Sequence, residues 1–336
     1  MAARFRYVVS DMDGTLLSPN HTISDYTRDT LKALVHEFGV TPILATGRCY
    51  ADVRVVAENL KKHIWGDGTT LPGALPATSP TRAPMLYLIT SNGAVVHNGV
   101  THELVLRSCI EPALAEKILL LLASDETVVN TNAYQNEDWV CRIDWPEMMA
   151  ANQESGIRYI HVPQPPPSSA YTPATSAAAA TAADASPRGI EIGDYSGISK
   201  IFFITDDAAR MSLLADEVRA IAAAHGGAMP SLTFSTSDCM DIMADGVTKG
   251  AALRQLFSAV LPAKDGVDVV ADAIAHSIGF GDGLNDAEML STVGKGCAMG
   301  NANPKLTAQH PELEVIGTNA EDGVAKKLRS VFGLQL

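Results

Sequence analysis

The sequence predicts an α/β protein in which a Rossmann-like core with a parallel sheet is interrupted by an inserted α+β cap domain. Short β-branched runs alternate with amphipathic helices in the first third of the chain, which is typical of parallel strands joined by helical crossovers. The alternation stops near Leu106, where helices and strands mix without strict order, and it returns at Lys249. We therefore expect residues 1–106 and 236–336 to form the core and residues 107–235 to form the cap.

Length and charge limit the classes of function. The chain has 336 residues, of which 46% are hydrophobic, and this is enough for two domains. A formal net charge of −13 argues against nucleic acid or anionic membranes as partners. The five cysteines are scattered without a CxxC pair, so neither a disulfide framework nor a zinc site is predicted.

Localisation is expected to be cytoplasmic. No apolar run approaches the roughly 18 residues of a membrane span, and the first strand begins near residue 5, which leaves no room for a signal peptide. We expect a monomer or a weak homodimer.

The first strand leads into two carboxylates. Residues 6–10 form a short apolar run, and Asp11 and Asp13 follow in an open turn that Gly14 permits. Ligands of open α/β sheets bind at the carboxyl ends of the strands. One carboxylate can act as a nucleophile while the other transfers protons, and a metal ion would relieve their repulsion. An Asp-Gly turn with solvated acids is the structural alternative.

The second strand–helix unit ends its strand on small polar residues. Ser24 is a good N-cap and Gly39 a good C-terminal residue for the helix between them, and residues 40–45 form the next apolar strand. Thr46 and Gly47 follow it, offering a hydroxyl and a backbone N–H to a phosphate oxygen. Ordinary turn chemistry explains the same pair equally well.

The third strand, residues 85–89, places Asn92 at its carboxyl end, facing the same crevice. Asn98-Gly99 between apolar residues predicts a β-hairpin. Residues 66–84, rich in Gly, Pro and Thr, are expected to be a surface insertion.

Cap elements are expected from the next apolar patterns. An amphipathic helix is predicted around residues 114–122 and another around 211–221. Strands are predicted at residues 127–129, 139–143, 198–204, 232–234 and 240–243.

A Pro-, Ala-, Ser- and Thr-rich run at about residues 163–188 has almost no large apolar side chains and is predicted to be a disordered insertion. Deleting residues 166–186 should therefore change the melting temperature and kcat/KM very little. A large fall in either quantity would show that the segment is structural or gates the site.

The returning core contributes the remaining candidates. Lys249 opens a helix, where it can hold a phosphate or simply lie on the surface. Residues 262–275 are expected to form a loop with one short helix. A strand at residues 276–278 leads to Asp282, a plausible ligand for a hard metal, and to Asp286, whose alternative role is to favour the helix dipole.

Four motifs follow one another along the chain: Asp11 and Asp13, Thr46 and Gly47, Lys249, and Asp282 with Asp286. Taken in this order, they resemble the haloacid dehalogenase superfamily of phosphohydrolases, and most closely its Cof-type sugar-phosphatase branch with a C2B cap. The resemblance covers nearly the whole chain. Single motifs are weak, but four in the right order are specific. Further segments that fit the branch are Ser91–Ala94, Ala298–Ala302 and Glu321–Ala325.

The resemblance implies a Mg²⁺-dependent phosphatase for small phosphate monoesters. Asp11 would attack phosphorus to form an aspartyl phosphate, and Asp13 would protonate the leaving alcohol and then activate water. Asp13 must hold a proton for the first step, so a dry, capped site should raise its pKa. Mg²⁺ would be held by Asp11, Asp282 and the backbone carbonyl of Asp13.

The other motif residues receive supporting roles from the same resemblance. Thr46, Gly47 and Lys249 would hold the phosphoryl oxygens, and Asn285 and Asp286 would complete the phosphate and metal surroundings. Arg48 is a weaker candidate for bridging to the cap or the substrate.

Other functions remain open at this point. A phosphomutase of the same superfamily shares the aspartyl phosphate, and a catalytically silent protein of this fold would bind without turnover. A dehalogenase is disfavoured because its nucleophile needs neither a second acid nor a metal, whereas Asp13 and Asp282 are present.

Overall fold

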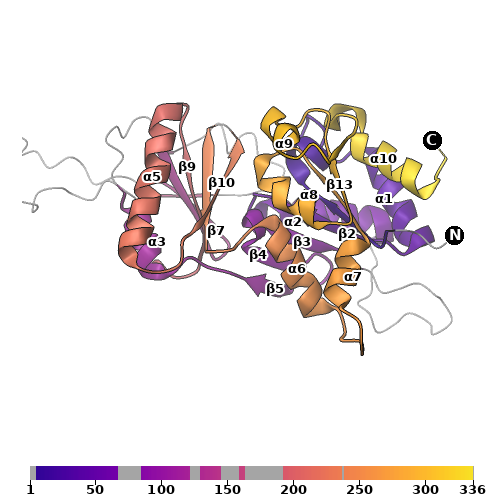
Figure 1. Cartoon of the computed structure of the whole chain (residues 1–336), viewed down its shortest axis with the longest axis horizontal. Coiled ribbons are helices and arrows are strands. Elements are labelled where there is room, and N and C mark those ends of the chain that lie inside the picture. The colour runs from indigo at the N-terminus through magenta and orange to yellow at the C-terminus, as the bar shows by residue number, and fades with distance from the viewer. Residues whose placement is uncertain are drawn as a thin grey trace, which may run out of the picture.

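The computed structural model describes residues 5–66, 85–121, 129–144, 159–162, 192–236 and 238–335. These residues form two sheets, each with its own helices (Figure 1). The core elements are β1 (Tyr7–Ser10), α1 (Asp25–Phe38), β2 (Thr41–Ala45), α2 (Tyr50–Trp65), β3 (Tyr87–Thr90), β4 (Val95–Asn98), β5 (Leu104–Arg107), α6 (Lys249–Val260), α7 (Val269–Ala275), β12 (Ser277–Gly281), α8 (Ala287–Thr292), β13 (Lys295–Ala298), α9 (Pro304–Gln309), β14 (Glu314–Val315) and α10 (Gly323–Phe332).

The core sheet has the strand order β14-β13-β12-β1-β2-β3-β4-β5. Strands β14 to β3 are parallel, and β4 and β5 add an antiparallel edge through the predicted hairpin. The chain builds outward from β1 in one direction through β2 and β3, and in the other through β12 and β13. The strand order therefore reverses between β1 and β12, which is where open α/β sheets bind ligands.

Helices cover both faces of the core sheet, and successive side chains of its strands point to opposite faces. Val8 belongs to the hydrophobic cluster that includes α1, α2 and α10, whereas Val9 belongs to the cluster that includes α6, α7, α8 and α9. Ser24 caps α1 by accepting a hydrogen bond from the Thr27 amide at 3.1 Å, and Gly39 ends it at φ +65°. Within the described ranges, no helix combines the length and the apolar character that crossing a membrane requires.

The cap is a six-stranded sheet with the order β10-β11-β9-β6-β7-β8. Its described elements are α3 (Pro112–Leu119), β6 (Asn130–Gln135), β7 (Asp138–Cys141), β8 (Tyr159–His161), β9 (Ile198–Ile204), α5 (Ala208–His225), β10 (Ser231–Thr236) and β11 (Cys239–Met243). Neighbouring strands are antiparallel except β7 and β8. The helices α3 and α5 lie on the side of this sheet that faces away from the core (Figure 1).

Alternation along the cap strands separates two faces. Ile201 and Phe203 of β9 pack with α3 and α5 in the cap's own hydrophobic core. Lys200 and Phe202 alternate to the opposite face, which borders a cavity shared with the core. The cap therefore presents a partly polar face to the core.

One expectation about the chain's organisation needs correction, and three others lie wholly or partly outside the described residues. The predicted boundary at residue 235 is too early, because β11 extends the cap sheet to Met243. In the sequence, the alternating apolar residues Met240 and Ile242 already indicate that a further cap strand follows residue 235. The insertion at 163–188, most of the one at 66–84, and the first two residues of the strand at 127–129 lie outside the described residues. The segment 262–275 contains the short helix α7, as predicted.

Candidate active site

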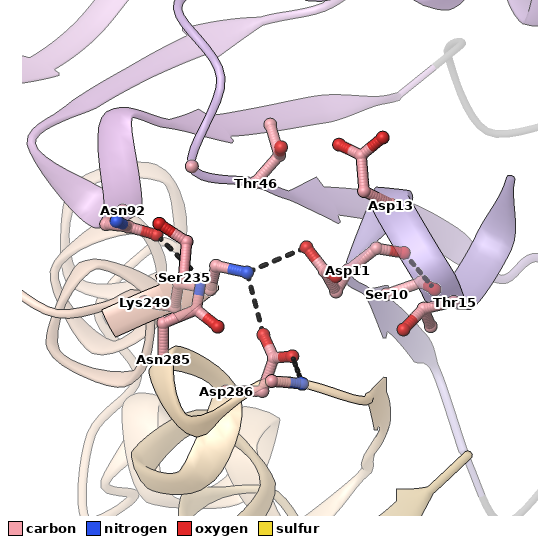
Figure 2. A network of polar contacts seen from close by, with 12 residues as sticks. Ser10, Asp11, Asp13, Thr15, Thr46, Asn92, Ser235, Lys249, Asn285 and Asp286 are labelled. Atoms are coloured by element: carbon pink, nitrogen blue, oxygen red, sulfur yellow. Dashed lines mark hydrogen bonds and ion pairs between the residues drawn. The ribbon is translucent and has the colours of Figure 1, made fainter. Parts of the chain in front are cut away.

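The candidate active site lies at the point where the strand order reverses. Asp11 follows β1 and Asp282 follows the neighbouring parallel strand β12, so both leave the sheet at the same edge. Thr46 follows β2 and Asn92 lies just after β3 on that edge. Figure 2 shows the side chains of Asp11, Thr46 and Asn92 around that of Lys249, the first residue of α6. Asp11, Thr46 and Asp282 border a cavity of about 470 Å³, which is lined by Asp11, Asp13, Gly14, Thr46, Gly47, Arg48, Tyr134, Lys200, Phe202, Ser235, Thr236, Cys239, Asp282, Gly283 and Asn285.

Lys249 is the fixed positive charge of the site. Its Nζ lies 2.7 Å from Asp11 Oδ1 and 2.7 Å from Asp286 Oδ1, and its side chain is fully buried. Burial opposes its charge, but the two carboxylates outweigh burial and raise the pKa of Lys249 above its ordinary value. An ammonium has three donors, so one remains for a ligand after these two bonds. The surface-lysine alternative is therefore excluded.

The acids form a tight cluster. Carboxylate oxygens of Asp11, Asp282 and Asp286 lie within 4.8 Å of one another. Burial, followed by the charge of Asp286, raises the pKa of Asp11 well above its ordinary value, and the same two causes raise the pKa of Asp282 to about 6. A divalent cation would remove this electrostatic cost, because it neutralises the charges that repel one another.

Asp286 has a structural task within this cluster. Its Oδ2 accepts hydrogen bonds from the backbone amides of Asp282 and Gly283, at 3.0 and 2.9 Å, while its Oδ1 accepts from Lys249. Both oxygens are therefore engaged. Asp286 organises the turn after β12 and holds Lys249, and it also adds negative charge next to Asp11 and Asp282.

The turn after β1 requires glycine at position 14. Gly14 has φ +71°, and a Cβ added there would lie 2.4 Å from Asp282 Oδ2. Thr15 Oγ1 donates to Asp282 Oδ1 at 2.8 Å, which ties the turn to the opposite acid. The Gly14 carbonyl accepts from Asn301 Nδ2 at 2.7 Å. The segment around Asn301, singled out in the sequence, thus supports the turn after β1.

Asp13 is placed differently from the expectation. Its carboxylate lies 41% exposed and accepts two hydrogen bonds from Arg48, from Nε at 2.7 Å and from Nη2. Burial would raise the pKa of Asp13, but the hydrogen bonds and charge of Arg48 outweigh it, and the pKa falls below its ordinary value. The predicted rise in this pKa is therefore wrong for the structure as it stands. Arg48 contacts Asp13 and also Asp52, at 3.0 Å, which the sequence did not indicate.

Three further polar residues lie in the turns after β2, β3 and β12, and two of them, Thr46 and Asn285, line the cavity. Thr46 Oγ1 accepts from the Arg48 amide at 3.2 Å, so its hydroxyl hydrogen is left for another acceptor. Asn285 Nδ2 donates to Asn92 Oδ1 at 3.0 Å. The backbone amide of Asn92 donates to the Thr46 carbonyl at 3.0 Å, so Thr46, Asn92 and Asn285, which are far apart in the sequence, lie together.

The cap supplies the other wall of the cavity, and the sequence did not single out its members. They are Tyr134, Lys200, Phe202, Ser235, Thr236 and Cys239. A usable signal was present, because the mostly apolar strands β9 and β11 contain the charged residues Lys200 and Asp241. A charged residue in the middle of such a cap strand indicates which face of the cap sheet is turned toward a site.

Comparison with known proteins identifies the family. A family profile described as haloacid dehalogenase-like hydrolase matches residues 8–328. A protein named putative phosphatase from Haemophilus influenzae is 34% identical, with 98% of each chain covered. A protein named HMP-PP phosphatase from Cronobacter sakazakii is 30% identical, over 95% of this chain and 92% of its own.

Solved structures share the fold. A structure titled as a subclass IIB sugar phosphatase of the same superfamily superposes with a TM-score of 0.64 at 17% identity, covering 98% of this chain and all of its own. The profile match spans nearly the full length of the chain, including both parts of the core and the inserted cap. On these grounds the chain belongs to the haloacid dehalogenase-like hydrolases.

Proposed function

We propose that this protein is a Mg²⁺-dependent phosphatase that hydrolyses small phosphate monoesters through an aspartyl phosphate on Asp11. The observation that carries the proposal is the contact between the carboxylate of Asp11, which lines the cavity, and the buried ammonium of Lys249. A nucleophile beside a fixed cation suits phosphoryl transfer, which depends mainly on positioning and on neutralising charge. The names of the curated relatives support the same class of reaction.

The acids fit a magnesium ion. Asp11 and Asp282 offer carboxylate oxygens whose pKa values are raised by burial and by neighbouring charge, so a cation would be favoured there. We expect these two side chains and the backbone carbonyl of Asp13 to hold it. When bound, Mg²⁺ would neutralise charge on the phosphoryl group.

The chain's own groups supply the remaining steps. An Asp11 oxygen forms a bond to phosphorus while the ester P–O bond breaks, and the leaving oxygen takes a proton from Asp13. Water then attacks phosphorus, Asp13 accepts its proton, and the acyl phosphate bond breaks to restore Asp11. Lys249 and the Thr46 hydroxyl hold phosphoryl oxygens, with the Gly47 turn and Asn285 beside them.

Proton donation requires a change at Asp13, because Arg48 holds it as a carboxylate. We expect Arg48→Met to raise the pKa of Asp13. Since the general acid must be protonated in the free enzyme, the limb of kcat/KM that falls with rising pH should move to higher pH. The matched control is Arg54→Met, an exposed arginine of α2, the helix that follows Arg48. An unmoved limb in Arg48→Met would show that Arg48 does not govern this proton.

The substrate is proposed to be a small soluble ester, a sugar phosphate, rather than a phosphoprotein. A cavity of about 470 Å³ under the cap has room for a small molecule, and its wall combines aromatic rings with hydroxyls. The net charge of −13 disfavours acidic macromolecules. The curated relatives named HMP-PP phosphatase make a second small-molecule candidate for this chain.

Phosphate release measured with Mg²⁺ tests the proposal. Hexose phosphates, nucleotides and phosphopeptides would be compared at matched concentrations. We expect a higher kcat/KM for a small ester than for any phosphopeptide, and the opposite order would contradict the capped site. A phosphomutase would rearrange a sugar phosphate without releasing phosphate, and a silent binding protein would do neither.

A further inference from the structure

The cap face that borders the cavity carries a buried ion pair. Lys200 Nζ of β9 lies 2.9 Å from Asp241 Oδ1 of β11, and the two residues are only 4% and 0% exposed. Burying charges is unfavourable unless further hydrogen bonds satisfy them. The partners that satisfy this pair come partly from the core domain, which points to a role at the interface.

Lys200 contacts the phosphate-binding turn. Its Nζ donates to the backbone carbonyl of Gly47 at 2.8 Å, between Thr46 and Arg48. The same ammonium lies 4.8 Å from the ring centroid of Tyr134 and 4.5 Å from that of Phe202. These rings favour the cation and confine it, so a cap side chain fixes the position of a core turn.

Asp241 contacts the third strand end. Its Oδ2 accepts from Asn92 Nδ2 at 2.8 Å and from the hydroxyl of Ser235. An ionised carboxylate only accepts hydrogen bonds, so it can receive the nitrogen of the Asn92 amide but not the oxygen. The Asn92 oxygen is then turned to Asn285, whose Nδ2 donates to it at 3.0 Å.

We propose that Lys200 and Asp241 are a positioning pair that fastens the cap onto the phosphate-binding residues and sets the orientation of Asn285. Lys200 holds the Gly47 turn, while Asp241 directs Asn92, and Asn92 directs Asn285. The phosphoryl-binding side of the site is therefore complete only while the cap contacts the core. This inference rests on the proposed phosphatase function but assigns roles that the reaction alone does not require.

The kinetic test uses Asp241→Asn and Lys200→Met in the full-length protein, with a hexose phosphate as the probe. Because small misplacements of reacting groups cost up to about 100-fold, we expect kcat/KM to fall about 10- to 100-fold, with more of the loss in kcat than in KM. Asp241→Glu keeps the acceptor and should recover part of kcat. The exposed cap residue Asp216, replaced in Asp216→Asn, is the matched control.

Removing one partner of a buried pair can also unfold the protein. The double variant Lys200→Met/Asp241→Asn leaves no unpaired charge and should show a loss in kcat smaller than the product of the two single losses, because the residues act through one contact network. A folded Asp241→Asn or double variant with wild-type kcat and KM would overturn the proposal.

Hydrogen exchange of the substrate-free protein gives a readout that does not depend on activity. We expect faster exchange at residues 46–48 and 91–93 in both single variants. If a single variant unfolds, the double variant should show the same change. Exchange in Asp216→Asn should stay as in the wild type. Unchanged exchange at both turns would overturn the positioning role. If the wild-type protein released no phosphate from any ester, the proposed function would fail, while the exchange data would still decide the role of the pair.

Discussion

Asp11→Asn should abolish turnover and leave the fold intact. The amide removes the attacking oxygen, and losses of about 10⁴-fold or more are usual when a nucleophile is removed. Asp11 lies at a strand end in a cluster of like charges, so the change removes repulsion with Asp286 and Asp282 as well as an attraction to Lys249. We therefore expect a melting temperature without metal that is no lower than that of the wild type.

The matched control is Asp265→Asn, which changes an exposed acid in the loop before α7. It should keep wild-type kcat and melting temperature. Substantial phosphate release by purified Asp11→Asn would rule out Asp11 as the nucleophile.

Removing divalent metal should abolish activity, and Mg²⁺ should restore it where Ca²⁺ does not. Ca²⁺ takes more ligands at longer distances, which would disturb the in-line arrangement. Because the ion binds the folded state, Mg²⁺ at about 100 times its dissociation constant should raise the free energy of unfolding by about 2.7 kcal/mol. The measurements are phosphate release and thermal unfolding after EDTA treatment, and full turnover in excess EDTA would contradict the metal assignment.

Without metal, Asp11 and Asp282 should stabilise the folded protein more at low pH than at high pH, which is opposite to the effect of carboxylates with lowered pKa values. Asp11 and Asp282 have folded-state pKa values above their ordinary values, and for Asp282 the value is about 6. The folded state therefore binds protons more tightly than the unfolded state at these positions, so their contribution to stability grows as the pH falls from 7 toward 6 and below. Mg²⁺ should reverse this trend, because it binds the carboxylates and competes with protons.

The part of the site that depends on strand ends could be predicted from the sequence. Asp11, Thr46 and Asp282 each follow an apolar run, and parallel strands bring their carboxyl ends to one edge of the sheet. Lys249 could be placed because it opens a helix after the cap, although its complete burial between two carboxylates was not visible in the sequence. These predictions follow from the order of the parallel strands, which short apolar runs in the sequence are enough to indicate.

The part that depends on side-chain pairing across domains could not be predicted. Arg48 was a weaker candidate for bridging to the cap or the substrate, and the sequence did not indicate that its guanidinium binds Asp13 in the turn after β1. Lys200 and Asp241 lie on cap strands that meet only after folding, and their partners Gly47 and Asn92 are in the core. Such contacts depend on how one domain is seated on the other, which hydrophobic periodicity does not encode.

The most direct test of the covalent mechanism is to trap the intermediate. Wild-type protein with Mg²⁺ and a hexose phosphate would be quenched with acid during turnover and its peptides weighed by mass spectrometry. We predict a phosphoryl group on the peptide containing Asp11, sensitive to hydroxylamine as an acyl phosphate is, and absent from Asp11→Asn. Steady turnover with no modified peptide, or a phosphoryl group on another residue, would contradict the account.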